Sequence, residues 1–195
     1  MSLIVVILAA GQGTRMRSKL PKVLHEVGGV SMLAHTIATA EQLGADRIVV
    51  VYGHGGEHVK QAINKDSIVW VEQSTQLGTG HAVQQALPHF TGSQGENILI
   101  LYGDVPLVRP ETLQALLSAQ QSAPMAILTT RQEDPFGYGR IVRNNKGRVL
   151  KITEEKDADE TTRKINEINT GILCASSQHL CRWLTEINND NHQNE

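Results

Sequence analysis

The chain has 195 residues, of which 40% are hydrophobic and 19% charged, and its formal net charge at pH 7 is -2. This length suffices for one α/β domain with a proper core, and the absence of a basic excess disfavours a nucleic-acid-binding role. No apolar run approaches the roughly 20 residues of a membrane span, and the first apolar run is too short for a signal peptide. We therefore expect a cytoplasmic protein with no membrane partner, and its two cysteines, Cys174 and Cys181, should be reduced thiols.

The first strong structural signal is residues 3–10, LIVVILAA, an almost unbroken apolar run rich in β-branched residues. Such a run, stopped by glycine, predicts a strand buried on both faces of a parallel sheet. Gly11 and Gly13 then permit a sharp turn and a close approach of the backbone to a ligand. The charged residues that follow are all cations: Arg15, Arg17, Lys19 and Lys22. A bare loop at a strand end, followed by fixed positive charge, is suited to a polyphosphate.

Two familiar phosphate loops do not match this stretch. The Rossmann dinucleotide pattern requires a third glycine where Met16 stands, and the Walker A pattern requires a Gly-Lys-Ser/Thr sequence that is absent. The residues alone favour a phosphate loop of a third kind over an ordinary glycine turn by only a small margin.

The rest of the first half alternates predicted helices and strands. Apolar residues at helical spacing predict a helix over 32–43, with Gly44 as its stop. Further strands are expected at 47–52, 68–71 and 98–102, and further helices at 57–63 and 82–87. No acidic residue ends the second strand, which is evidence against NAD binding. Glycines separate His54 from His58, so we interpret this pair as part of a solvated loop rather than as metal ligands.

Polar residues lie beside the third and fourth predicted strands. Thr79, between two glycines at a helix start, can face a ligand together with backbone N–H groups; an ordinary capped helix N-terminus is the alternative. Asp104 follows the fourth strand, and ligands bind beyond the carboxyl ends of strands in open α/β sheets. Since Mg²⁺ takes one or two carboxylates plus phosphate oxygens and water, we favour Asp104 as a Mg²⁺ ligand over an Asp that makes a turn bond.

The second half is predicted to form a mixed lobe. The expected elements are a helix at 110–118, strands at 125–130, 137–142, 148–153 and 168–173, and an amphipathic helix at 180–187. The charged segment 154–164 is predicted to be a solvated helix or loop, and the polar residues 188–195 a frayed end. Because we find neither repeats nor a low-complexity linker, residues 1–195 are predicted to form a single domain.

The motifs together resemble those of the sugar-phosphate nucleotidylyltransferases. They are LAAGQGTRM (8–16) with Pro21-Lys22, QLGTGHA (76–82), YGDVP (102–106) and GYGRI (137–141). In combination they are most similar to the N-terminal uridylyltransferase half of the bacterial GlmU family, the bifunctional UDP-N-acetylglucosamine pyrophosphorylases and glucosamine-1-phosphate N-acetyltransferases. The resemblance implies an α/β, Rossmann-like nucleotidyltransferase fold: a mostly parallel mixed sheet flanked by helices, with a smaller sugar-binding lobe.

The resemblance also implies a reaction. UTP and N-acetylglucosamine 1-phosphate would give UDP-N-acetylglucosamine and pyrophosphate with Mg²⁺ as cofactor, for peptidoglycan and lipopolysaccharide precursors. An in-line attack on phosphorus needs positioning and charge neutralisation more than a covalent nucleophile, which agrees with the absence of a convincing Ser-His-Asp or Cys-His arrangement. Two alternatives remain open: a related enzyme that uses dTTP or CTP, and a nucleotide-sugar-binding module without turnover.

Individual roles follow from the same resemblance. The residues implied to line the nucleotide are Leu8, Ala9, Ala10 and Gly11, and those of the uridine pocket are Gln73, Gly78 and Thr79. Arg15 and Lys22 would hold the triphosphate and offset charge that develops in the transition state. Asp104 would bind Mg²⁺ beside Tyr102 and Gly103. The implied sugar contacts are Gly139, Glu154, Asn169 and Thr170.

The chain departs from the family pattern in several respects. Gln12 stands where many relatives carry a charged residue, which would weaken phosphate attraction. A second Mg²⁺-coordinating Asn of the family would lie beyond residue 195. The hexapeptide repeats of the β-helix acetyltransferase half, through which full-length relatives are expected to form homotrimers, do not occur. We therefore expect a uridylyltransferase domain, incomplete at its C-terminal end and without the β-helix acetyltransferase domain, and we assign it no acetyltransferase activity.

Overall fold

The computed structural model describes residues 2–11, 13, 16–53, 56–90 and 95–187. The strands are β1 (Ser2–Ala9), β2 (Glu26–Val27), β3 (Val30–Ser31), β4 (Arg47–Gly53), β5 (Ile68–Gln73), β6 (Glu96–Tyr102), β7 (Met125–Arg131), β8 (Arg140–Arg143), β9 (Val149–Thr153) and β10 (Glu167–Ser176). The α-helices are α1 (Met32–Gln42), α2 (Glu57–Ile63), α3 (Thr79–Gln85), α4 (Pro110–Gln120), α5 (Glu160–Arg163) and α6 (Ser177–Glu186). Single 3-10 turns form η2 (Lys22–Leu24), η3 (Leu87–His89) and η4 (Glu155–Asp157).

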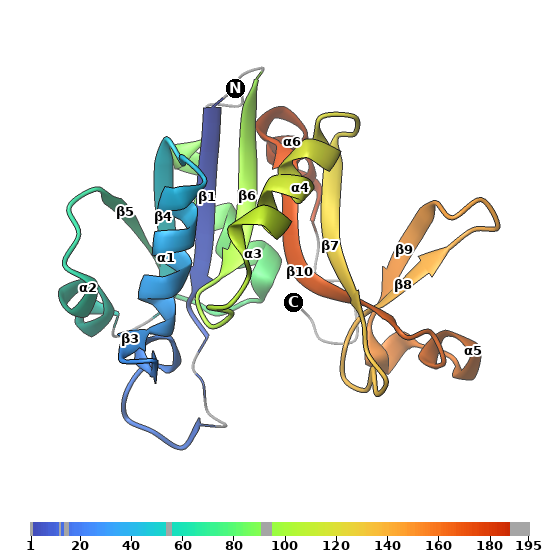
Figure 1. Cartoon of the computed structure of the whole chain (residues 1–195), viewed down its shortest axis with the longest axis horizontal. Helices are drawn as coiled ribbons and strands as arrows, with labels where there is room; N and C mark the ends of the chain where they lie inside the picture. Colours follow the sequence, from blue (N-terminus) through green and yellow to red (C-terminus); the bar gives the residue numbers. More distant parts are fainter. Residues whose placement is uncertain (1, 12, 14–15, 54–55, 91–94, 188–195) are drawn as a thin grey trace.

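One large sheet organises the molecule (Figure 1), with the strand order β5-β4-β1-β6-β10-β8-β9 and with β7 paired to β10 outside this order. The strands β5, β4, β1 and β6 are parallel, whereas β10 is antiparallel to both β6 and β7. The chain adds β4 and β5 on one side of β1 and then returns to place β6 on the other side. This reversal confirms the predicted α/β fold class, and it creates a crevice at the carboxyl ends of β1 and β6 where such sheets bind ligands.

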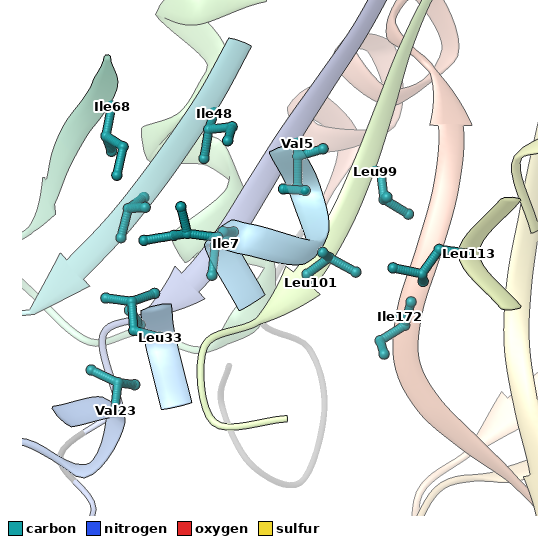
Figure 2. Close-up of a cluster of buried hydrophobic side chains, with 14 of the residues drawn as sticks. Val5, Ile7, Val23, Leu33, Ile48, Ile68, Leu99, Leu101, Leu113 and Ile172 are labelled. Carbon is teal, nitrogen blue, oxygen red and sulfur yellow. The ribbon is translucent and has the colours of Figure 1, made fainter. Parts of the chain in front are cut away.

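The strand β1 is buried on both faces, as its apolar run predicts. Val5 and Ile7 contact the cluster that includes Leu33 of α1 and Leu113 of α4 (Figure 2). The intervening Val6 belongs to a second cluster, on the side of α3 and α6. Because successive side chains of a strand point to opposite faces, this double burial fixes the register of β1 and the point at which the loop after Ala9 leaves the sheet.

The strand β10 joins the two halves of the molecule. It pairs with β6 over Leu173 to Ser176, and Ile168 near its other end pairs with Arg140 of β8. Its register with β7 shifts between Asn169 and Leu173, and Gly171 within this irregularity has φ +79°. The strand predicted at 168–173 is shorter than β10, because the apolar run that indicates it covers only part of the strand. The bulge itself leaves no signal in the sequence. In Figure 1 the β8–β9 hairpin and α5 lie at one end of the sheet, beyond β7 and β10.

Smaller differences from the predicted elements have local causes. The glycine turn at Gly28–Gly29 is the tip of a two-stranded hairpin, β2–β3, and both glycines have positive φ. Helix α3 begins at Thr79 rather than at residue 82, so Thr79 is the first helical residue.

Both cysteines are free thiols, as predicted, and burial raises the pKa of Cys174 to about 12. None of the helices in the described residues combines the length and the apolar character of a membrane span.

The ion pair between Arg143 of β8 and Glu167 of β10 predicts a pH effect on stability. Arg143 Nε and a terminal nitrogen donate to the two carboxylate oxygens at 2.8 and 2.6 Å, and these bonds hold the pKa of Glu167 at about 2. The pKa of Glu167 is therefore lower in the folded state than in the unfolded state. The stabilisation by the Arg143–Glu167 pair is present above pH 4.5 and is lost as the pH falls towards 2. We expect Glu167→Gln to make the free energy of unfolding, measured in urea between pH 5 and pH 2.5, less steep with pH. An unchanged slope would contradict the pairing.

Candidate active site

A cavity of about 400 Å³ lies at the carboxyl edge of the sheet, around the β1/β6 reversal. Its lining residues come from segments far apart in the sequence: Leu8, Ala9, Ala10, Gly11, Lys22, Val23, Gln73, Gln76, Gly78, Thr79, Ala82, Tyr102 and Asp104. The structure therefore brings together most residues assigned to the nucleotide and to Mg²⁺. Gly103 lies behind the lining, where its N–H donates to Leu8 O at 2.9 Å, and Arg15 lies outside the described residues.

Lys22 and Asp104 face each other in this cavity. Lys22 Nζ donates to Asp104 Oδ2 at 2.5 Å, and the two side chains are 37% and 27% exposed. The contact joins the glycine loop after β1 to the residues that follow β6. Gly13 makes it possible: its φ is +58°, and a Cβ there would lie 2.7 Å from Lys22 Cβ. A side chain at position 13 would collide with the first carbons of the Lys22 side chain, so this glycine accommodates Lys22 itself.

Two amide side chains of the cavity lining hold backbone segments in place. Gln73 is 3% exposed, and its Nε2 donates to Gly78 O at 3.1 Å, which holds the start of α3 against the end of β5. Gln76 Nε2 donates to Ala10 O at 2.6 Å and fixes the backbone that leaves β1. Sequence reasoning did not assign a role to Gln76, because a polar residue in a loop gives no signal of what it binds. The only available indication was its place in the QLGTGHA motif.

Tyr102 connects the cavity to the second half of the molecule, from α4 to α6, which we call the second lobe. Burial raises the pKa of its hydroxyl, and the negative charges of Asp104 and Glu154 raise it further, against the opposing effect of a hydrogen bond with Thr79. The Tyr102 ring packs on the backbone of Gly171, where a Cβ would lie 2.5 Å from the hydroxyl oxygen. Tyr102 therefore lies beside Thr79 of the cavity and beside the irregular segment of β10.

The residues assigned to the sugar gather next to Tyr102 but do not line the cavity. Glu154 Oε1 lies 2.7 Å from the position that a Cβ of Gly139 would occupy, and Asn169 N donates to Gly139 O at 2.8 Å. The Thr170 hydroxyl donates to Leu128 O at 2.6 Å and accepts from Ile172 N at 3.2 Å. These bonds hold the β10 irregularity against β7, so Thr170 has a structural task that the sequence did not indicate.

Asp104 is suited to a magnesium ion that arrives with its substrate. Among the described residues, no group of three or more His, Cys, Asp or Glu side chains could hold a metal. Mg²⁺ typically uses one or two carboxylates and completes its shell with phosphate oxygens and water. A single half-buried carboxylate at the mouth of a cation-containing cavity fits that pattern, and it does not fit a metal cage made of protein ligands alone.

Residues 5–180 match the MobA-like NTP transferase domain. The chain belongs to this family. It is also 53% identical, over all 195 of its residues, to the bifunctional protein GlmU of Idiomarina loihiensis (strain ATCC BAA-735 / DSM 15497 / L2-TR), and it covers 42% of that protein. The chain thus spans less than half the length of this relative. The predicted resemblance to nucleotidyltransferases of the GlmU type is confirmed.

Solved structures with low sequence identity share the fold. A UDP-glucose pyrophosphorylase complexed with UDP-glucose superposes with a TM-score of 0.79 at 16% identity, covering 99% of this chain and 83% of that one. A putative glucose-1-phosphate thymidylyltransferase from Bacillus anthracis, in complex with a sucrose, has a TM-score of 0.70 at 19% identity and covers 92% and 73%. Both likenesses support the predicted Rossmann-like nucleotidyltransferase fold.

The contact between Gly171 and Tyr102 predicts that Gly171→Ala destabilises the protein. An alanine at φ +79° carries backbone strain of about 1–2 kcal/mol, and the clash with the Tyr102 ring adds a further 1–3 kcal/mol or so. Gly147→Ala is a matched control, because Gly147 has φ +77° and nothing within 4 Å of a Cβ. Urea unfolding should therefore show a clearly larger loss for Gly171→Ala. Equal losses would mean that the Tyr102 ring moves aside freely.

Proposed function

We propose that the chain catalyses Mg²⁺-dependent uridylyl transfer from UTP to N-acetylglucosamine 1-phosphate, giving UDP-N-acetylglucosamine and pyrophosphate. The observation that carries this proposal is the meeting of Lys22 and Asp104 in a cavity that also contains Gln73 and Thr79. The 53% identity to a GlmU protein supports the choice of substrates. The product would supply peptidoglycan and lipopolysaccharide precursors.

The nucleotide would occupy the cavity from the start of α3 to Lys22. Uracil would lie by Gln73, Gly78 and Thr79, because an amide and backbone groups can pair with the edge of a base. The backbone from Leu8 to Gly11 would follow the ribose and the first phosphates. Gln76 would assist indirectly, since it fixes Ala10 O and with it the path of this backbone.

The reaction needs charge neutralisation at the phosphates. An oxygen of the sugar phosphate attacks the α-phosphorus in line; the bond from that phosphorus to the bridging oxygen of the β-phosphate breaks, and pyrophosphate leaves. Lys22 would donate to the phosphates and offset the charge that develops there. Asp104 would hold Mg²⁺, which supplies Lewis-acid charge stabilisation when it is bound. The Lys22–Asp104 contact keeps both groups at one point of the cavity.

The sugar would lie on the side of Tyr102 that faces the second lobe. Glu154 and Asn169 carry the carboxylate and amide groups expected to bind sugar hydroxyls and an N-acetyl group, and Gly139 leaves room for Glu154. Thr170 remains a predicted sugar contact: its hydroxyl donates to Leu128 O and accepts from Ile172 N, which would hold the shape of β10, and it keeps one acceptor lone pair for the sugar. Arg15 remains a predicted phosphate ligand.

Pyrophosphate release tests the proposal. The chain would be incubated with Mg²⁺, N-acetylglucosamine 1-phosphate and one of UTP, dTTP or CTP. We expect turnover with UTP and a kcat/KM at least tenfold lower with the other nucleotides. A preference for dTTP or CTP would replace the uridylyl assignment by the related nucleotidylyltransferase. Binding of UTP with Mg²⁺ but no pyrophosphate from any pair would support a binding module instead.

A further inference from the structure

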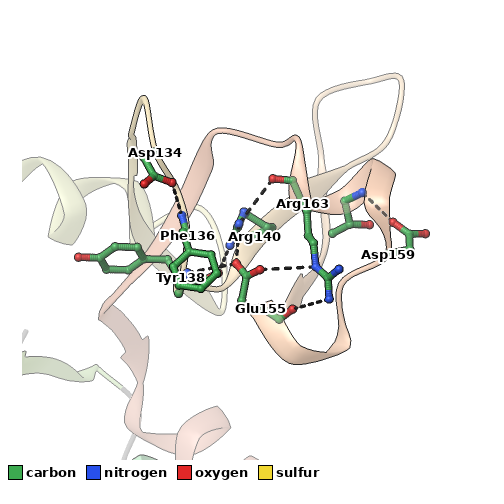
Figure 3. A network of polar contacts seen from close by, with 9 residues as sticks. Asp134, Phe136, Tyr138, Arg140, Glu155, Asp159 and Arg163 are labelled. Carbon is green, nitrogen blue, oxygen red and sulfur yellow. Dashed lines mark hydrogen bonds and ion pairs between the residues drawn. The ribbon is translucent and has the colours of Figure 1, made fainter.

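A buried cation lies behind the residues assigned to the sugar. Arg140, the first residue of β8, is 2% exposed although it is charged. Its guanidinium donates to Tyr138 O and, at 2.7 Å, to Glu155 Oε2 (Figure 3). Arginine is almost never fully buried unless it is paired. The guanidinium therefore connects the loop before β8 to η4.

The Glu155 carboxylate also contacts two other segments of the lobe. Its Oε2 also accepts from Gly137 N at 3.1 Å, and its Oε1 lies 3.5 Å from Arg163 Nε of α5. These donors come from the loop before β8, from β8 itself and from α5, and they hold the pKa of the Glu155 carboxyl below its usual range, with Arg140 as the largest cause. One carboxylate thus fixes three segments of the lobe relative to one another, as Figure 3 shows.

Both members of this pair are direct neighbours of residues assigned to the sugar. Gly139 precedes Arg140, and Glu154 precedes Glu155. The two assigned residues also touch, since Glu154 Oε1 would lie 2.7 Å from a Cβ at Gly139. The ion pair between Arg140 and Glu155 therefore lies directly behind the two assigned residues, Gly139 and Glu154, and is covalently linked to both.

We propose that Arg140 and Glu155 are positioning residues for the sugar phosphate, which hold Gly139 and Glu154 in the arrangement that binds it. This inference rests on the proposed function. A buried ion pair is weak evidence for stability, because desolvation of the charges offsets their attraction and an apolar pair of similar size often serves as well. The particular contribution of the pair is geometric: the planar guanidinium holds a backbone carbonyl and a carboxylate in fixed directions. Binding groups need such support, since small misplacements weaken binding strongly.

Steady-state kinetics of paired variants test this inference. Arg140→Met/Glu155→Gln removes both charges together, so that neither is left buried and unpaired. We expect its KM for N-acetylglucosamine 1-phosphate to rise by about 10- to 100-fold, the scale of losing a group that orients a ligand-binding residue, while its KM for UTP changes less than about twofold. Arg140→Lys should recover part of the loss, because an ammonium keeps the charge and can reach one acceptor but not the same fork geometry.

Arg143→Met/Glu167→Gln is the matched control. It removes an Arg–Glu pair that also starts from β8, but neither residue is adjacent to Gly139 or Glu154. We expect both of its KM values to stay within about twofold of the parent chain. Thermal unfolding of every variant checks the fold, and if the double variant does not fold, the KM ratio of Arg140→Lys decides.

The outcomes separate this inference from the proposed function. If the parent chain releases pyrophosphate from UTP and the double variant raises both KM values equally, or neither, the positioning role is wrong and the proposed function stands. An equal rise of the sugar-phosphate KM in the control variant would also contradict the positioning role. If the parent chain releases no pyrophosphate with any nucleotide, both proposals fail together.

Discussion

Lys22→Ala is expected to lower kcat for pyrophosphate release by about two to three orders of magnitude, the scale of losing one preorganised charge partner in a transition state. Lys22 Nζ is the cation that lies 2.5 Å from Asp104 in the cavity, and Gly13 leaves the space that its side chain occupies. Removal of the cation leaves developing phosphate charge without this partner. Single-turnover kinetics at saturating UTP and Mg²⁺ would measure the chemical step directly.

Lys19→Ala provides the control for this prediction. Lys19 is an exposed lysine of the same loop that does not line the cavity, so the net charge changes equally in both variants. We expect Lys19→Ala to keep kcat within about twofold of the parent chain. Equal rates for the parent chain and Lys22→Ala would remove Lys22 from the mechanism.

Asp104→Ala is expected to abolish Mg²⁺-dependent turnover at millimolar metal. Asp104 is the carboxylate at the end of β6 that lines the cavity, and a substrate-delivered Mg²⁺ site with one carboxylate has no substitute ligand among the neighbouring described residues. Loss of the carboxylate also leaves Lys22 without its partner, which alters the charge balance of the cavity. A Mg²⁺ titration of pyrophosphate release, from micromolar to tens of millimolar, would show whether any activity returns.

Two further variants make this result specific. Asp104→Asn keeps the size of the side chain and removes its charge, so it should be nearly as inactive as Asp104→Ala. Asp66→Ala removes an exposed carboxylate between α2 and β5, and it should retain the Mg²⁺ dependence of the parent chain. If Asp104→Ala keeps normal Mg²⁺-dependent turnover, the metal binds elsewhere.

The residues that form the cavity could largely be predicted because their signals are local and simple. An apolar run ended by glycine predicts a buried parallel strand, and the carboxyl ends of parallel strands share one edge of a sheet. That reasoning brings the loop after β1 and Asp104 after β6 to the same edge, and the structure confirms their contact.

The second lobe was harder to predict, because its organisation depends on contacts that leave no periodic trace. Arg140 is buried because Glu155 supplies the compensating charge from a different segment, and no local pattern reveals this pairing. The Thr170 hydroxyl donates to Leu128 O of β7 beside the β10 irregularity, a bond that no local pattern reveals, and its contact with the sugar stays a prediction. In both positions, the partner comes from another segment of the chain.

The most direct test of the central claim is a crystal structure of the chain with Mg²⁺ and a UTP analogue in which a methylene group replaces the α,β-bridging oxygen. We expect the triphosphate to contact Lys22 Nζ, the metal to bind Asp104 and the phosphates, and the uracil to lie against Gln73 and the start of α3. A nucleotide bound away from the β1/β6 edge, or bound there with its metal far from Asp104, would contradict the account.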